Sequence, residues 1–141
     1  FKAIGILMLR YAKEQPKLFQ LLFMAENSQA RRFEDVFDSL GETAKLSIEF
    51  VMNDYGLTTE EARFLFQYVW TFTYGVSAMS ATGMCDFSED ELVNMLGNEF
   101  MAVMSFIKSG MLDSIITGIR PVKRDGADGA ALGTIGFEKS E

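Results

Sequence analysis

The chain has 141 residues, 48% of them hydrophobic and 13% aromatic, with a formal net charge of −7. This length and composition suit one domain with a hydrophobic core and exclude a disordered chain. The negative charge argues against direct binding to nucleic acid, because phosphate contacts dominate that affinity. Charged and amide residues interrupt every apolar segment, so we expect no membrane partner.

The first part of the chain predicts three helices. Residues Phe1–Glu14 have apolar side chains at helical spacing, and the proline after Gln15 ends that pattern and suits the first turn of a second helix, Pro16–Ala25. A long helix is predicted over Gln29–Tyr55, because a single apolar phase continues through Gly41. A break at Gly41 is the alternative, since glycine costs about 1 kcal/mol in a helix relative to alanine.

Capping signals mark the helices of the second part. Thr58 with Glu61, and Ser88 with Glu91, have the spacing of capping boxes. Glycines at positions 56 and 83 suit the left-handed residue that follows a helix. The helices predicted from these signals are Thr58–Gly83, Ser88–Lys108 and a further turn or two within Met111–Ile119.

The two long helices of this part are apolar over more than one face. A helix that is apolar nearly all round is buried on several sides, and a small chain has little interior to surround it. We therefore expect one side to pack inside the subunit and another against a second copy, giving a homodimer. The alternative is that these side chains only cover the subunit's own core. The residues expected at the dimer interface are Phe72, Val76, Met79, Phe100, Val103, Met104 and Ile107.

Aromatic and methionine side chains provide the candidate ligand site. They could line a pocket of roughly 300–1,000 Å³ for an apolar small molecule, and methionine adapts to varied ligand shapes. The alternative is an ordinary packed core. The candidate ligand-binding residues are Tyr11, Phe23, Phe37, Phe50, Met52, Phe66, Trp70 and Tyr74.

Catalytic and metal sites are not indicated. The chain has no histidine, which removes the usual general base and the commonest zinc ligand. Acidic residues in first helical turns are explained by the helix dipole. Cys85 is the single cysteine, so no internal disulfide forms and a cytoplasmic location is expected. We interpret Cys85 as a plain linker residue, and a redox role is the weaker alternative. We therefore predict no enzyme activity, no catalytic residue, no metal and no cofactor.

Three segments resemble the C-terminal domain of TetR-family bacterial transcriptional regulators. Arg10–Met24, RYAKEQPKLFQLLFM, resembles the family's helix, proline break and short apolar helix. Leu57–Met79 resembles its penultimate helix, with Trp70 and Gly75 matching and Tyr74 where histidine is common. Phe87–Met104, FSEDELVNMLGNEFMAVM, resembles its last helix, and the resemblance extends from the start of the chain to about residue 107.

The resemblance implies an all-α domain of about five main helices that dimerises through the last two as a four-helix bundle. It also implies a cavity for an apolar or amphipathic effector, and DNA binding through an N-terminal helix-turn-helix domain that this chain lacks. Residues 1–108 would form the ligand-binding and dimerisation domain, and residues 109–141 a C-terminal extension that is flexible after about 120. The chain starts inside a helical pattern, so we expect it to be part of a longer protein.

Two other functions remain open at the level of sequence. One is a helical enzyme or cofactor-binding protein that uses the same apolar cavity. The other is a purely structural dimerisation module, which predicts a filled interior with no space for a ligand.

Overall fold

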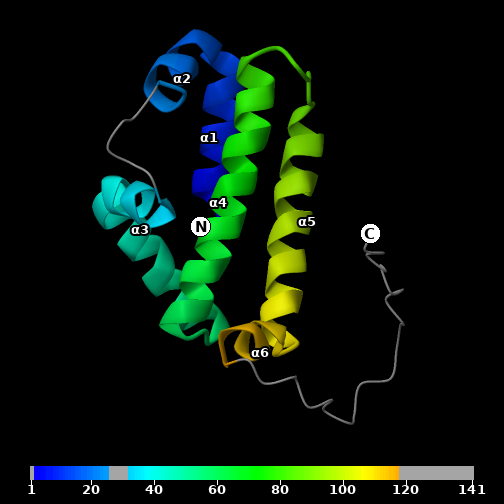
Figure 1. The fold of residues 1–141 in the computed structure, drawn as a ribbon. Helices are drawn as coiled ribbons and strands as arrows, with labels where there is room; N and C mark the ends of the chain where they lie inside the picture. Colours follow the sequence, from blue (N-terminus) through cyan, green and yellow to red (C-terminus); the bar gives the residue numbers. More distant parts are fainter. Residues whose placement is uncertain (1, 26–31, 118–141) are drawn as a thin grey trace, which may run out of the picture.

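The computed structural model describes residues 2–25 and 32–117, and its regular structure there is entirely helical (Figure 1). This confirms the predicted all-α class. Within these residues no helix combines the length and apolar character needed to cross a bilayer. The described helices are α1 (Lys2–Glu14), α2 (Pro16–Phe23), α3 (Phe33–Tyr55), α4 (Thr59–Ala81), α5 (Glu89–Lys108) and α6 (Met111–Thr117).

Helix α4 is the centre of the bundle. It packs against α1, α2, α3 and α5, and Figure 1 shows it running lengthwise between α1 and α5. The sequence causes this arrangement, because Leu65, Val69 and Val76 lie on one stripe of α4 and are buried in the main core. Burying such side chains stabilises the fold by roughly 1.5–3 kcal/mol each.

The predicted ends of α4 are confirmed. The Thr58 amide donates to Glu61 Oε2 over 2.8 Å, and the Glu61 amide donates to Thr58 Oγ1 over 3.2 Å. At the other end Gly83 has a φ of 72°, and the Met84 amide donates to the Met79 carbonyl over 3.0 Å. Gly56, with a φ of 62°, ends α3 in the same way. Local chemistry therefore sets where these helices stop.

Helix α3 is kinked. Gly41 has φ 58° and ψ −135°, a conformation outside the helical region, although helical hydrogen bonding continues on both sides. The prediction of an uninterrupted helix at Gly41 was therefore wrong, and the alternative break describes the backbone better. Glycine explains the difference, because it adopts positive φ without the clash that a Cβ atom causes.

Some predicted boundaries also differ. Helix α2 ends at Phe23 instead of Ala25, because the Met24 amide makes the last helical bond, to Gln20. Helix α3 starts at Phe33, and the preceding Arg32 is extended, with its amide donating to Asp35 Oδ2 over 2.9 Å. The predicted starts at Phe1 and Gln29, and the predicted end at Ile119, lie outside the described residues.

Helix α6 packs on the bundle. It contacts α5, and its Leu112 is buried in the main core. The chain turns into α6 at Gly110, whose φ is 75°. Part of the segment predicted as an extension is therefore integral to the folded unit; the segment 120–141, expected to be flexible, lies outside the described residues.

Candidate functional site

A cavity of about 480 Å³ lies inside the bundle. Side chains of α1, α3, α4 and α5 surround it. The lining residues are Ile4, Gly5, Met8, Leu40, Thr43, Ala44, Ser47, Phe50, Val51, Asp54, Tyr55, Phe66, Val69, Trp70, Thr73, Leu96, Gly97, Phe100 and Met101.

The exposure of these residues separates a floor from a mouth. Phe66, Val69 and Thr73 of α4 are buried and form the floor. Phe50 of α3 and Met101 of α5 are 61% and 63% exposed and Ile4 of α1 is 47% exposed, so the cavity opens to solvent beside these residues.

Glycine creates part of the space. Gly97 lines the cavity, and a Cβ atom there would meet no other atom within 4 Å. Gly5 lets α1 approach α5 closely, since a Cβ atom at this position would lie 2.7 Å from Leu96 Cδ2. The kink at Gly41 falls beside Leu40 and Thr43, so α3 changes direction at the cavity wall.

The polar groups of the lining are few. Ser47 Oγ donates to the Thr43 carbonyl over 2.8 Å, and Thr73 Oγ1 donates to the Val69 carbonyl over 2.6 Å. These hydroxyl protons are used within their own helices, so only the oxygen lone pairs remain for a further hydrogen bond. Within residues 2–25 and 32–117, Asp54 is the only charged side chain in the lining.

Three of the predicted ligand-binding residues, Phe50, Phe66 and Trp70, line this cavity. Two others lie beside it in the core. The Phe37 and Phe66 rings are in an edge-to-face contact, with their centroids 5.6 Å apart. The Arg63 guanidinium lies over the Phe37 ring, 4.5 Å from its centroid. Met52 packs against the main core.

The remaining three predicted residues form a separate aromatic cluster where α1, α2 and α4 meet. Tyr11 and Phe23 lie with their ring centroids 6.5 Å apart, and Phe19 lies between α1 and α4, 6.4 Å from Tyr74. The Tyr74 hydroxyl donates to the Phe23 carbonyl over 2.8 Å. A backbone carbonyl thus satisfies the polar end of Tyr74.

The predicted dimer residues divide into two groups. Val76, Val103, Met104 and Ile107 are buried within the single chain, where α4 and α5 pack on each other and on the rest of the core. Phe72, Met79 and Phe100 are partly exposed, and Phe100 lines the cavity.

Another apolar surface of the same two helices remains exposed. Phe64 stacks on Tyr68 at 4.3 Å and on Phe106 of α5 at 5.7 Å, and Tyr68 is 49% exposed. Residues three and four apart continue this surface along each helix. We define the outer α4–α5 face by Phe64, Tyr68, Phe72, Gly75 and Met79 of α4 with Met95, Ala102 and Phe106 of α5.

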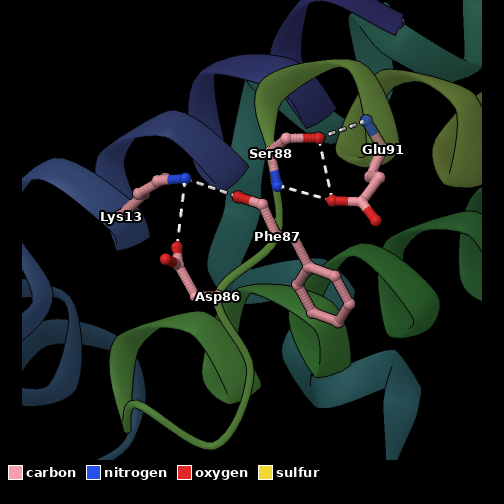
Figure 2. Close-up of polar contacts among 5 residues, drawn as sticks. All are labelled: Lys13, Asp86, Phe87, Ser88 and Glu91. Carbon is pink, nitrogen blue, oxygen red and sulfur yellow. Dashed lines mark hydrogen bonds and ion pairs between the residues drawn. The ribbon is translucent and has the colours of Figure 1, made fainter.

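Polar contacts fix the link between α4 and α5 to the end of α1 (Figure 2). Lys13 Nζ donates to the Phe87 carbonyl and lies 3.3 Å from Asp86 Oδ1. Beside it, the Ser88 amide and hydroxyl both donate to Glu91 Oε2 over 2.8 Å. These bonds lower the pKa of the Glu91 carboxyl, the amide bond contributing most. The predicted second capping box is therefore confirmed.

A second hollow lies between α1 and α5 near this link. It measures about 250 Å³, below the usual range for ligand pockets, and its wall includes the ion pair of Arg10 with Glu89. Within residues 2–25 and 32–117, no three histidine, cysteine or acidic side chains lie together as metal ligands.

The larger cavity is thus the most developed site among the described residues, with an apolar floor, hydroxyl acceptors and one carboxylate. Comparisons with protein-family models, curated proteins and solved structures found no match to this chain.

Proposed function

We propose that this chain is the effector-binding and dimerisation domain of a TetR-like bacterial transcriptional regulator that works in the cytoplasm. The cavity of about 480 Å³ is the observation that carries the proposal. Its volume lies within the range of small-molecule sites, roughly 300–1,000 Å³, and its lining is mostly apolar, as such sites are.

The cavity favours a ligand-binding domain over a structural module. Protein interiors are close-packed and seldom leave voids larger than one water molecule. At about 480 Å³, this space is far larger than the roughly 30 Å³ share of one water molecule. A module selected only for dimerisation has no need of such a space in its core.

The proposed mechanism is indirect. The ligand binds one arrangement of the helices better than another and shifts the population between them. Two copies meet through the outer α4–α5 face, so a change within each copy alters how the two DNA-reading domains of the full-length dimer are spaced. That spacing decides operator fit, and the domain described here touches no DNA.

Trp70 makes ligand binding measurable, since it is the single tryptophan of the chain and lines the cavity. We expect the uncharged dye Nile red to change Trp70 fluorescence and to raise the melting temperature. Gly97→Leu should fill the cavity and weaken dye binding at least tenfold, a loss of about 1.4 kcal/mol. Asn94→Leu is the matched control, because Asn94 is exposed on α5 outside the lining.

Equal dye binding by the wild-type chain and Gly97→Leu would place the dye on the surface and overturn the cavity proposal. The regulator part is tested on the full-length gene product. There we expect a helix-turn-helix segment upstream of Phe1, DNA fragments retained by the dimer, and their release by a cavity ligand. A full-length product without DNA affinity would favour the helical enzyme instead.

A further inference from the structure

We infer that the cavity selects an apolar molecule that carries a cationic head, with the head beside Asp54 at the mouth and the apolar body on the α4 floor. A primary or quaternary amine on a hydrocarbon chain belongs to this class. The inference rests on the proposed function, because it names the ligand class of the same cavity.

The charge of the lining is the first argument. Asp54 is exposed at the α3 side of the mouth, and among the residues that the structure describes no lysine, arginine or histidine lines the cavity. The Asp54 carboxylate makes no hydrogen bond or ion pair with any residue in the described part of the chain. Its carboxylate is therefore available to a ligand.

Two cations on α5 and α4, Lys108 and Arg63, are engaged elsewhere. Lys108 Nζ donates to the Tyr55 carbonyl over 2.9 Å, on the residue next to Asp54, and Lys108 is not part of the lining. Arg63 lies over the Phe37 ring, also outside the lining. An anionic ligand would thus enter an apolar space without a cationic partner, which is strongly unfavourable.

The hydrogen-bonding groups of the lining also favour a cationic head. The buried hydroxyls of Ser47 and Thr73 donate to the carbonyls of Thr43 and Val69, so these two hydroxyls bring no free donor to the lining. The Asp54 carboxylate at the mouth accepts hydrogen bonds and donates none, so it complements an ammonium group, which brings donors and no acceptor.

Aromatic rings complete the site. Phe50, Tyr55 and Phe100 lie in the lining toward the mouth, and the Tyr55 and Phe100 rings contact each other at 5.4 Å. Ring faces attract a nearby cation by about 0.5–2 kcal/mol. The cationic head of such a ligand thus meets a carboxylate and aromatic ring faces at the mouth of the cavity. The hydrocarbon part of the ligand reaches Phe66 and Val69.

The experiment uses three probes with the same ten-carbon chain and different heads, namely decylamine, decanol and decanoate. Trp70 fluorescence and isothermal titration calorimetry report binding at pH 7.5, below the concentrations at which the probes form micelles. We expect decylamine to bind best and decanoate worst. Asp54→Asn should weaken decylamine about 5- to 10-fold, as for a partly exposed charged contact, and leave decanol within about twofold.

Two further variants sharpen the test. Glu49→Gln removes an exposed acid of the same helix that does not line the cavity, and it should leave all three affinities unchanged. Asp54→Lys should reverse the preference, so that decanoate binds better than decylamine. The reversal cannot arise from a simple loss of folding.

The outcomes separate the inference from the proposed function. The inference would be overturned if decanol binds and all three probes have equal affinities, or if decanol binds and decanoate binds best. Either result would leave the proposed cavity function intact. Failure of all three probes to bind the wild-type chain would overturn the inference, and the proposed function would fall with it only if Nile red also fails to bind.

Discussion

Gly41 is the single residue on which the shape of α3 depends. With φ 58° and ψ −135° it occupies a region that other residues enter only at a cost of about 1–3 kcal/mol. We expect Gly41→Ala to lower the free energy of unfolding by that amount, measured by urea denaturation. Gly75→Ala is the control and should raise it by up to about 1 kcal/mol, because Gly75 is helical with open space around it.

A stabilising effect of Gly41→Ala, equal to that of Gly75→Ala, would contradict the kink. It would mean that α3 is straight in solution, as the apolar phase of the sequence alone predicts. The cavity wall beside Leu40 would then differ from the one described.

The cavity residues were only partly predictable one by one. Phe50, Phe66 and Trp70 were found because aromatic side chains are common in ligand sites. Asp54 and Thr43 were missed, because periodicity tells which side of a helix is buried and not whether that side meets a neighbour or an empty space. The small residues Gly5 and Gly97 on two different helices were the available signal.

At the scale of the helix, the start of α5 depends on the carboxylate of Glu91. The Ser88 amide and hydroxyl hold the pKa of this carboxyl below its ordinary value of 4.5. Because the folded-state pKa is lowered, the ionised group stabilises the fold above pH 4.5, and this contribution disappears as the pH falls through the folded-state value.

Glu91→Gln keeps a hydrogen-bond acceptor and removes the charge. We expect the wild-type chain to melt at a higher temperature than this variant at pH 7, and the two melting temperatures to converge as the pH is lowered past 4.5 and below the folded-state pKa. Differential scanning calorimetry measures the gap. The same substitution in a Ser88→Ala background should show a smaller gap, since one of the two donors is then gone. A gap that persists at pH 2 would contradict the role of the carboxylate.

Helix ends were the most predictable elements, because each depends on a few adjacent residues. Thr58 with Glu61 and Ser88 with Glu91 form the bonds that their spacing predicts. The kink in α3 was less predictable, since an apolar phase can survive a local change of backbone direction. The packing of α6 through Leu112 was missed because a seven-residue helix has too few apolar positions to define a face.

At the scale of the whole molecule, the outer α4–α5 face predicts a homodimer. We expect the wild-type chain to sediment as a dimer and Gly75→Glu to sediment as a monomer with unchanged helical content. The new side chain has open space within the single chain, but it would bury a charge between two copies. Asn53→Glu on α3 adds the same charge away from this face and should remain dimeric. A wild-type chain that stays monomeric at high concentration would contradict the dimer.

The sequence predicted the all-α class, because apolar residues recur at helical spacing along most of the chain. It was less informative about which stripe of α4 and α5 faces outward. Both helices carry apolar side chains on adjacent stripes, so the pattern does not distinguish the stripe that holds Val76 and Met104 from the stripe that holds Tyr68. Only the packing of α1 and α3 onto α4 makes that choice.

The close approach at Gly5 gives the cavity a direct mechanical connection to α1. Leu96 lies in the cavity wall, and its methyl group is also the nearest neighbour of Gly5. Gly5 has no side chain that could move aside. A molecule that displaces Leu96 toward α1 therefore pushes directly on the α1 backbone. Helix α1 would then tilt about its other end, where Lys13 contacts the α4–α5 link and Arg10 pairs with Glu89 of α5.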